Sequence, residues 1–316
     1  GDARVYVYLR DLVSADGSTV ADACTGNTCS AHAIAENDFA GFSYPSIAEA
    51  IETVVPHELF HVVQLAYSNE QPSTWTEGSA VWAVEHLHGD ANGDFERFLP
   101  AFLGKTFRPF ERPVAGFGDN FPYGAALWPH YLATRDVAIV VDAWERSASA
   151  PFLDAIGGAL EARDATLADA WTDFTRWNAA TGSYAATDGY AGAAAWPEAV
   201  REATNAQIYI EGFSARYVPL AITERSLVSL DASVAITGWL LRDGASLADG
   251  IALDEFVPPG NYTLVVTGLQ RGAIVSPVTL AIEPAPVDDE SSGCSTSGSP
   301  SLLLALLARR RRVRAR

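Results

Sequence analysis

The feature that most constrains this chain is the motif HELFH at residues 57–61, which lies in an apolar run. Residues four apart share one face of a helix, so the imidazoles of His57 and His61 can bind one metal ion, with Glu58 bordering the site. Pro56 directly precedes the motif, so the helix either kinks there or starts afresh at the proline. Both outcomes keep the two histidines on one face, and the segment predicts a metal-binding helix.

A third ligand is offered by Glu77, sixteen residues after His61 in the segment WTEGSA at 75–80. Zinc in a hydrolase keeps three protein ligands and one open position for water. A carboxylate on a second helix can complete this set, which leaves Glu58 off the metal to take a proton from water and pass it to the leaving amine. The short motif also arises by chance, so a degenerate site without chemistry is the alternative.

The residues around Glu77 resemble a known group of enzymes. The sequence EGSA at 77–80 matches the Glu-x-x-Ala/Asp second motif of the gluzincins, metallopeptidases that include thermolysin. The fifteen-residue spacer between His61 and Glu77 is shorter than in thermolysin and the related aminopeptidases, which implies a tighter loop between the two helices.

More closely, the chain resembles a set of surface metalloproteases of myxobacteria. This resemblance covers about residues 1–190 and runs through residues 36–39, 57–64, 123–128 and 144–145. It implies a zinc endopeptidase-like active site.

Gluzincin-type catalysis also needs a donor that stabilises the oxyanion of the tetrahedral intermediate, usually a tyrosine or histidine further along the chain. Tyr123 is the candidate, with His130 and Tyr131 behind it. The aromatic, proline-rich loop that ends near Pro122 is either a lid or wall of the substrate site or simple packing over the helices. His32 is interpreted as a strand histidine, because the metal already has its ligands.

Length and charge restrict the partners. The 316 residues leave room for about two domains, and the formal net charge is -18. Such an acidic surface repels nucleic-acid phosphates and anionic membranes, so we expect no nucleic-acid partner. We expect a monomer that acts on a peptide or protein substrate.

Two features bear on location. Cys24 and Cys29 flank a Gly/Asn/Thr loop and are expected to form a small disulfide, because the further ligands of a Cys-rich metal site are absent. A disulfide favours an oxidising compartment. The chain has no methionine and begins at Gly1 in an apparent strand, so we expect an initiator and a signal peptide or pro-segment ahead of it.

Residues 285–316 are expected to be a linker and a C-terminal sorting tail. A polar stretch ends at Cys294 and is followed by an apolar run at 302–308 and a cluster of arginines. The apolar run is too short for an ordinary transmembrane helix of about 20 residues. The order resembles the MYXO-CTERM tail of myxobacteria, which implies processing near Cys294 and retention at the cell surface or outer membrane, or release from it. Membrane contact is expected only through this tail.

Periodicity predicts an α+β fold with two domains. Residues 1–200 are expected to form a mainly α-helical, zincin-like domain with a small N-terminal sheet, and residues 201–284 a β-sandwich-like accessory domain. Strands are expected at 4–9 and 32–35 with a loop between them. By analogy with gluzincins, residues 31–39 are expected to be an edge strand that lines the substrate cleft. Helices are expected to start near Ser46 and to span 74–88, 95–103, 137–147, 151–162 and 166–179.

The leading hypothesis is therefore an exported, surface-anchored zinc metallopeptidase. The main alternative is a catalytically inactive zincin-like binding or adhesion protein that acts through its β-domain. The presence of Glu58 favours the enzyme, because an inactive descendant would be free to lose it. Hydrolysis of a non-peptide bond is a third alternative, since ligands alone do not define the substrate.

Overall fold

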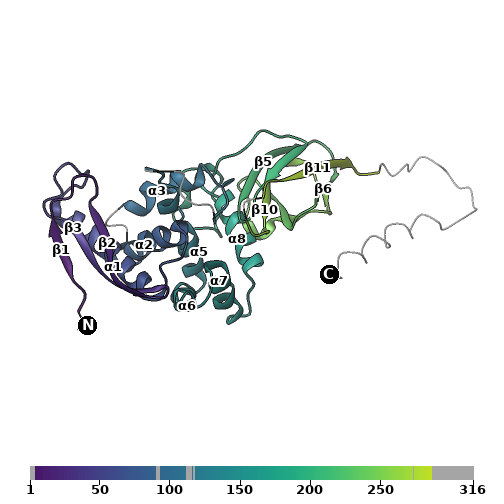
Figure 1. Ribbon diagram of the computed structural model, residues 1–316. Helices are drawn as coiled ribbons and strands as arrows, with labels where there is room; N and C mark the ends of the chain where they lie inside the picture. Colours follow the sequence, from purple (N-terminus) through teal and green to yellow (C-terminus); the bar gives the residue numbers. More distant parts are fainter. Residues whose placement is uncertain (1–3, 90–92, 112–115, 117, 273, 287–316) are drawn as a thin grey trace, which may run out of the picture. The chain divides into compact units, whose positions relative to one another are not determined.

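The computed structural model describes residues 4–89, 93–111, 116, 118–272 and 274–286 (Figure 1). Residues 1–284 form one compact unit, and the elements described below lie in it. Helices and sheets are both present, which confirms the α+β class. The apolar run and Cys294 of the predicted sorting tail lie outside the described residues. Within the described residues, no helix combines the length and apolar character needed to span a membrane.

Three strands form an N-terminal sheet in the order β1-β3-β2: β1 (Val7–Arg10), β2 (Gly17–Thr25) and β3 (Thr28–Glu36). Strand β1 runs parallel to β3, and β2 runs antiparallel to it. Two predictions are wrong here. The segment that was expected to be a loop contains β2, and β3, expected at the edge of the sheet, is its central strand. Pairing with β3 overrides the weak strand propensity of the Gly, Ala and Asp residues in β2.

Helix α1 (Ile47–Tyr67) carries the HELFH motif. It begins where Ser46 Oγ accepts a hydrogen bond from the backbone N–H of Glu49 at 3.2 Å. The helix runs through Pro56 as one element, although the proline lacks the N–H that would bond to the carbonyl of Glu52. Helix α1 packs against β3 and also against α2 (Ser73–His88) (Figure 1).

The remaining helices complete a core that is rich in aromatic side chains. Trp75, Trp128 and Phe174 are fully buried in it. From the helix expected at 166–179, Trp171 and Phe174 are buried, and Trp177 is partly buried against the same core. The further helices are α3 (Asp94–Leu103), α4 (Phe121–Gly124), α5 (Leu127–Arg135), α6 (Ala138–Arg146), α7 (Phe152–Glu161), α8 (Leu167–Ala179) and the short 3-10 helices η2 (Gly182–Tyr184), η3 (Ala193–Ala195) and η4 (Leu247–Asp249).

Strands dominate from residue 207 onward, where two four-stranded antiparallel sheets form, in the orders β5-β10-β7-β8 and β4-β11-β6-β9. One apolar cluster contains Ile210 and Val278 from one sheet and Val218 and Leu264 from the other, so the sheets bury their facing sides together. The strands are β4 (Gln207–Ile210), β5 (Ala215–Ile222), β6 (Ser226–Ala232), β7 (Ile236–Arg242), β8 (Ile251–Ala252), β9 (Phe256–Val257), β10 (Gly260–Gly268) and β11 (Ser276–Pro284). Of these, β8, β9 and β11 were not predicted.

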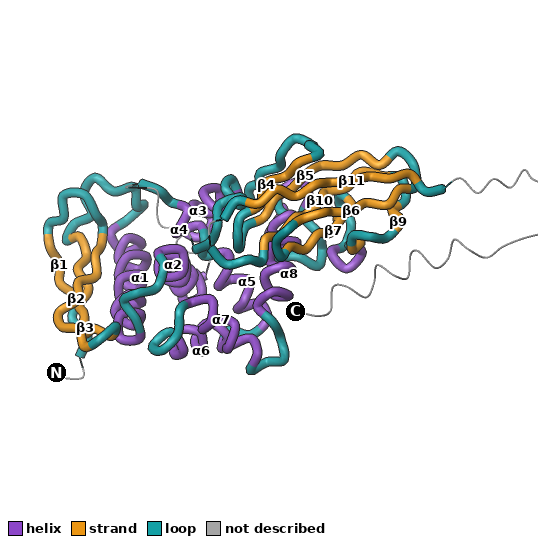
Figure 2. Tube along the Cα trace, turned by 45° about the vertical axis from the view of Figure 1, so that its right-hand side comes forward, coloured by secondary structure: helices purple, strands orange, loops and turns teal. Residues whose placement is uncertain are grey.

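Helix α8 connects the helical core to the strands (Figure 2). Thr175 Oγ1 lies 2.6 Å from Thr267 Oγ1 on β10, and Tyr217 on β5 donates a hydrogen bond to the carbonyl of Thr175 at 3.0 Å. The apolar cluster of the helices also includes Tyr217, Leu241 and Val265 from the strands. The helices and the β5-β10-β7-β8 sheet therefore share one hydrophobic core.

Candidate metal centre

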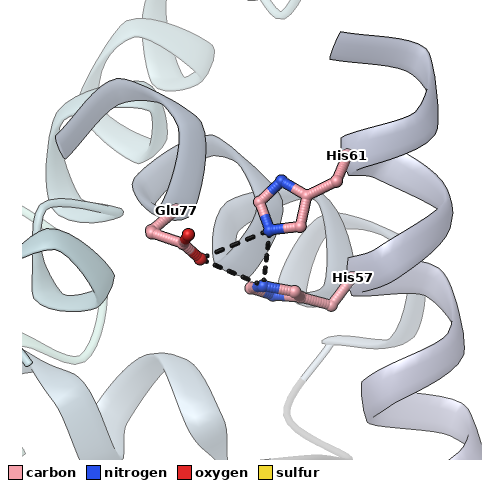
Figure 3. A group of neighbouring side chains, drawn as sticks. All are labelled: His57, His61 and Glu77. Atoms are coloured by element: carbon pink, nitrogen blue, oxygen red, sulfur yellow. Dashed lines mark hydrogen bonds and ion pairs between the residues drawn. The ribbon is translucent and has the colours of Figure 1, made fainter. Parts of the chain in front are cut away.

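Two adjacent helices bring the three predicted ligands together (Figure 3). His57 and His61 project from one face of α1 toward Glu77 on α2. The Nε2 atoms of the two histidines are 3.0 Å apart, and Glu77 Oε2 lies 3.3 Å from each of them. Among the described residues, this is the one group of three or more His, Cys, Asp or Glu side chains that could hold a metal ion. We call it the His57–His61–Glu77 triangle.

The dimensions of the triangle fit a zinc ion. Tetrahedral coordination with bonds of about 2.0–2.2 Å places neighbouring donor atoms about 3.3–3.6 Å apart. The two separations of 3.3 Å lie in that range, and the separation of 3.0 Å between the imidazoles lies about 0.3 Å below it. Two imidazoles and one carboxylate also form a ligand set that suits zinc and leaves one position for another ligand.

The electrostatics of the triangle favour a cation. Burial by itself would raise the pKa of Glu77, but hydrogen bonds with His57 and His61, and their charges, hold this pKa well below its usual range. Burial by itself would lower the pKa of His61, but its hydrogen bond and charge interaction with Glu77 raise it to about 9. The carboxylate thus holds a proton on His61, and metal binding would release it.

A buried network orients His61, and sequence reasoning did not predict it. The Nδ1 atom of His61 lies 2.6 Å from Gln64 Oε1, and Gln64 is 2% exposed. Gln64 Nε2 donates to the carbonyl of Thr76 at 2.9 Å and to Ser79 Oγ at 3.0 Å, and Trp144 Nε1 donates to the same Ser79 oxygen. These bonds use the amide nitrogen of Gln64, so the amide oxygen faces His61. Since that oxygen contacts His61 Nδ1, the other ring nitrogen, His61 Nε2, is the one that lies in the triangle. The sequence signal for this contact was that Gln64 follows His61 by three residues, a spacing that makes two side chains neighbours on a helix.

Glu58 lies outside the triangle and is 8% exposed. Thr19 Oγ1 on β2 is 2.7 Å from Glu58 Oε2, a contact that the predicted loop did not suggest. Burial raises the pKa of Glu58, and the charges of His57 and His61 oppose the rise. A raised carboxyl pKa suits a general base, which must accept a proton and then release it near neutral pH.

Tyr123 lies beside the triangle. Its ring, on α4, stacks on the His57 imidazole with centroids 6.0 Å apart and an interplanar angle of 16°. Burial, followed by the negative charges of Glu77 and Glu58, raises the pKa of Tyr123, so the hydroxyl keeps its proton. The alternatives His130 and Tyr131 do not line the cavities at the triangle.

Two open cavities, of about 460 and 440 Å³, meet at the triangle. The first is walled by Asp16, Tyr44, Arg97 and Phe98, and the second by Ser18, Thr19, Gln64 and Asn69. Both are lined by Gly17, His57, Glu58, Glu77 and Tyr123. The triangle therefore borders both cavities.

The aromatic loop before Tyr123 contributes to the helical core and also reaches the larger cavity. The side chains of Phe110 and Phe121 are buried in the core. Gly116, Gly118 and Asn120 line the larger cavity. Residues 112–115 and 117 of this loop lie outside the described residues.

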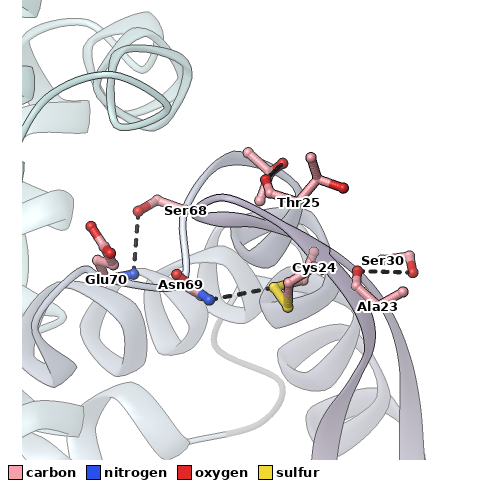
Figure 4. Close-up of a disulfide and its surroundings, with 9 residues drawn as sticks. Ala23, Cys24, Thr25, Ser30, Ser68, Asn69 and Glu70 are labelled. Carbon is pink, nitrogen blue, oxygen red and sulfur yellow. Dashed lines mark hydrogen bonds between the residues drawn. A yellow bond between two sulfur atoms is a disulfide. The ribbon is translucent and has the colours of Figure 1, made fainter.

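The predicted disulfide between Cys24 and Cys29 is confirmed (Figure 4). It closes the hairpin turn between β2 and β3, where the backbone N–H of Asn69 donates to the carbonyl of Asn27 at 2.8 Å. This hydrogen bond joins the hairpin turn to the segment that follows α1. His32 lies apart from the triangle, with Nδ1 2.7 Å from Asp22 Oδ1.

Comparison with known proteins adds no identity: no family model, no curated protein and no solved structure matches the chain. The function is therefore argued from the geometry of the triangle and its neighbours.

Proposed function

We propose that the chain is a zinc-dependent peptidase of the gluzincin type. The observation that carries this proposal is the close approach of two imidazole nitrogens and one carboxylate oxygen, with separations of 3.0 and 3.3 Å, next to a buried glutamate. His57, His61 and Glu77 would hold zinc. When bound, zinc polarises a carbonyl and acidifies water.

The other residues have separate tasks in this proposal. Glu58 accepts a proton from the attacking water and delivers it to the leaving amine. The Tyr123 hydroxyl, which keeps its proton, donates a hydrogen bond to the oxyanion that develops on the scissile carbonyl. Gln64 holds the ring of His61.

The substrate that fits best is an extended peptide or protein segment. The two cavities on either side of the shared residues give room for chain on both sides of the scissile bond. A net charge of -18 disfavours nucleic acids. The two sheets after residue 207 support the proposal of a β-sandwich-like accessory domain beside a zincin-like one, at residues 201–284 and 1–200.

We also propose export, with a location at the cell surface. The Cys24–Cys29 disulfide supports an oxidising compartment. The resemblance of the C-terminal sequence to a sorting tail supports anchoring there.

The test is cleavage of a mixed peptide library by the zinc-loaded protein and its Glu58→Gln variant, with zinc affinity measured for both. Glu58→Gln should keep the metal and lose cleavage by at least about 10²-fold, because it removes the base. Glu52→Gln, an exposed change on the same helix, is the matched control and should cleave like the parent. If the parent binds zinc and cleaves nothing, the proposal fails and the inactive binding protein becomes the better interpretation.

A further inference from the structure

Strand β2 crosses α1 at Glu58, and one hydroxyl contacts two oxygens of that residue. Thr19 Oγ1 lies 2.7 Å from Glu58 Oε2 and 2.8 Å from the backbone carbonyl oxygen of Glu58. A glutamate side chain has three rotatable bonds. A contact to its carboxylate alone would therefore let β2 and the carboxylate move together relative to α1. Because the same hydroxyl also contacts the main chain of α1, it fixes the carboxylate relative to its own helix.

The other carboxylate oxygen lies against the backbone of the same strand. A Cβ atom at Gly17 would come within 2.7 Å of Glu58 Oε1 and 2.5 Å of Val54 Cγ1. Real Cβ contacts are not this short, so any larger residue at position 17 would displace the strand or the carboxylate. The absent side chain lets β2 approach Glu58 closely enough for the Thr19 contact.

The sheet in turn holds this part of β2 in register. Gly17 pairs with Ala35 and Thr19 with Ala33 on the central strand. The backbone N–H of Glu36 donates to the carbonyl of Asp16 at 2.9 Å. The position of Thr19 is therefore set by strand pairing and does not depend on Glu58.

We propose that Thr19 is a positioning residue that holds the carboxylate of Glu58 where the attacking water must be deprotonated, an inference that rests on the proposed peptidase function. A general base has to lie within hydrogen-bond reach of the proton it removes, and a displacement of about 1 Å can lower the rate about 10²-fold. The Thr19 hydroxyl contacts two oxygens of Glu58 and no atom of the His57–His61–Glu77 triangle. Thr19 also lines the smaller cavity, so kcat and KM are measured separately to distinguish an effect on Glu58 from an effect on substrate binding.

If the Thr19 contact only stabilised the packing of β2 on α1, its removal would change other measured quantities. Loss of such a packing contact would lower stability and would weaken substrate binding and metal binding together. Loss of a positioning contact would lower kcat and leave KM and zinc affinity unchanged. A serine, which keeps the hydroxyl, would restore the rate.

The experiment compares the zinc-loaded parent with Thr19→Val, Thr19→Ser and the matched control Thr25→Val, which removes a hydroxyl from the exposed end of the same strand. The measurements are kcat, KM, zinc affinity and the thermal midpoint. We expect Thr19→Val to lose about 10- to 100-fold in kcat, with KM and zinc affinity within about twofold of the parent. Thr19→Ser and Thr25→Val should stay within about threefold of the parent in kcat.

Three results would overturn the proposal: parental kcat in Thr19→Val, an equal loss in Thr19→Ser, or a parallel loss of zinc affinity. If Thr19→Val does not fold, Thr19→Ala takes its place under the same criteria. If the parent itself cleaves nothing, the peptidase proposal fails, and crystal structures of the parent and Thr19→Val decide the positioning question separately. A Glu58 carboxylate displaced in the variant supports the role of Thr19, and an unmoved one refutes it.

Discussion

His61 Nδ1 and Gln64 Oε1 lie 2.6 Å apart, on the side of the imidazole that faces away from Glu77. Partners of this kind fix the tautomer and the orientation of a metal-binding histidine. Gln64→Leu should therefore lower zinc affinity about 10- to 100-fold, measured by competition with a chelating dye. Gln71→Leu, which removes an amide that does not contact His61, should bind zinc like the parent. Equal affinity in Gln64→Leu and the parent would contradict the assigned role.

The Tyr123 hydroxyl should act on the rate more than on the metal. Tyr123→Phe keeps the ring that stacks on His57 and removes the hydroxyl alone. We expect kcat to fall about 10²- to 10³-fold, because the oxyanion loses a donor. Zinc affinity should change much less, through the lost hydrogen bond between the Tyr123 hydroxyl and Glu77. Tyr131→Phe, a buried tyrosine away from both cavities, serves as the control. Retained kcat in Tyr123→Phe would remove this residue from the mechanism.

His130 should make the fold sensitive to acid. It is packed among the rings of Phe95, Tyr190 and Trp196, and burial lowers its pKa to about 4, from 6.5. Between these two pH values the unfolded chain binds more protons at His130 than the folded chain, so stability falls as the pH drops from 6.5 toward 4. The full loss from this residue is about 3 kcal/mol.

Urea unfolding of the parent and His130→Phe at pH 7 and pH 4.5 measures this contribution. The difference in unfolding free energy between the two pH values should be smaller in His130→Phe than in the parent. His88→Gln, which changes an exposed histidine at the end of α2, should follow the parent. The same pH dependence in parent and His130→Phe would refute the prediction.

The disulfide should stabilise the β2–β3 hairpin by a modest amount. Cys24 and Cys29 close a small loop, for which the chain-entropy relation gives about 2 kcal/mol. The Cys24→Ser/Cys29→Ser double variant should be less stable by that amount in denaturant unfolding. A reducing agent should lower the stability of the parent to the same level and leave the variant unchanged. Unequal effects of reduction and substitution would mean that the substitution disturbs more than the bond.

The sequence predicted the parts of the site that depend on local spacing. His57 and His61 are four residues apart on one helix, and Glu77 follows in a second motif, so their convergence needed only two adjacent helices. The contact between Thr19 and Glu58 spans 39 residues and depends on how β2 pairs with β3. Gly, Ala and Asp in β2 gave no strand signal, because the strand is formed by its pairing and not by its intrinsic propensity.

The helical segments were predicted more accurately than the strands. The apolar period at 166–179 marks α8 (Leu167–Ala179), since a helix needs only its own periodicity to be recognised. Strand β11 follows a turn and pairs with β4 and β6, from which it is distant in sequence. The contact of Tyr217 with α8 was likewise beyond sequence reasoning, because it joins two elements of different type.

The hydrophobic core shared by α8 and the β5-β10-β7-β8 sheet limits how this protein can evolve by recombination. An exchange with a breakpoint near residue 200 would separate Trp171 and Phe174 from Phe213 and Tyr217, and would leave each fragment with half of an apolar surface. The strands are therefore not an interchangeable cassette. The helices and strands of residues 1–284 would therefore have to be inherited or transplanted together.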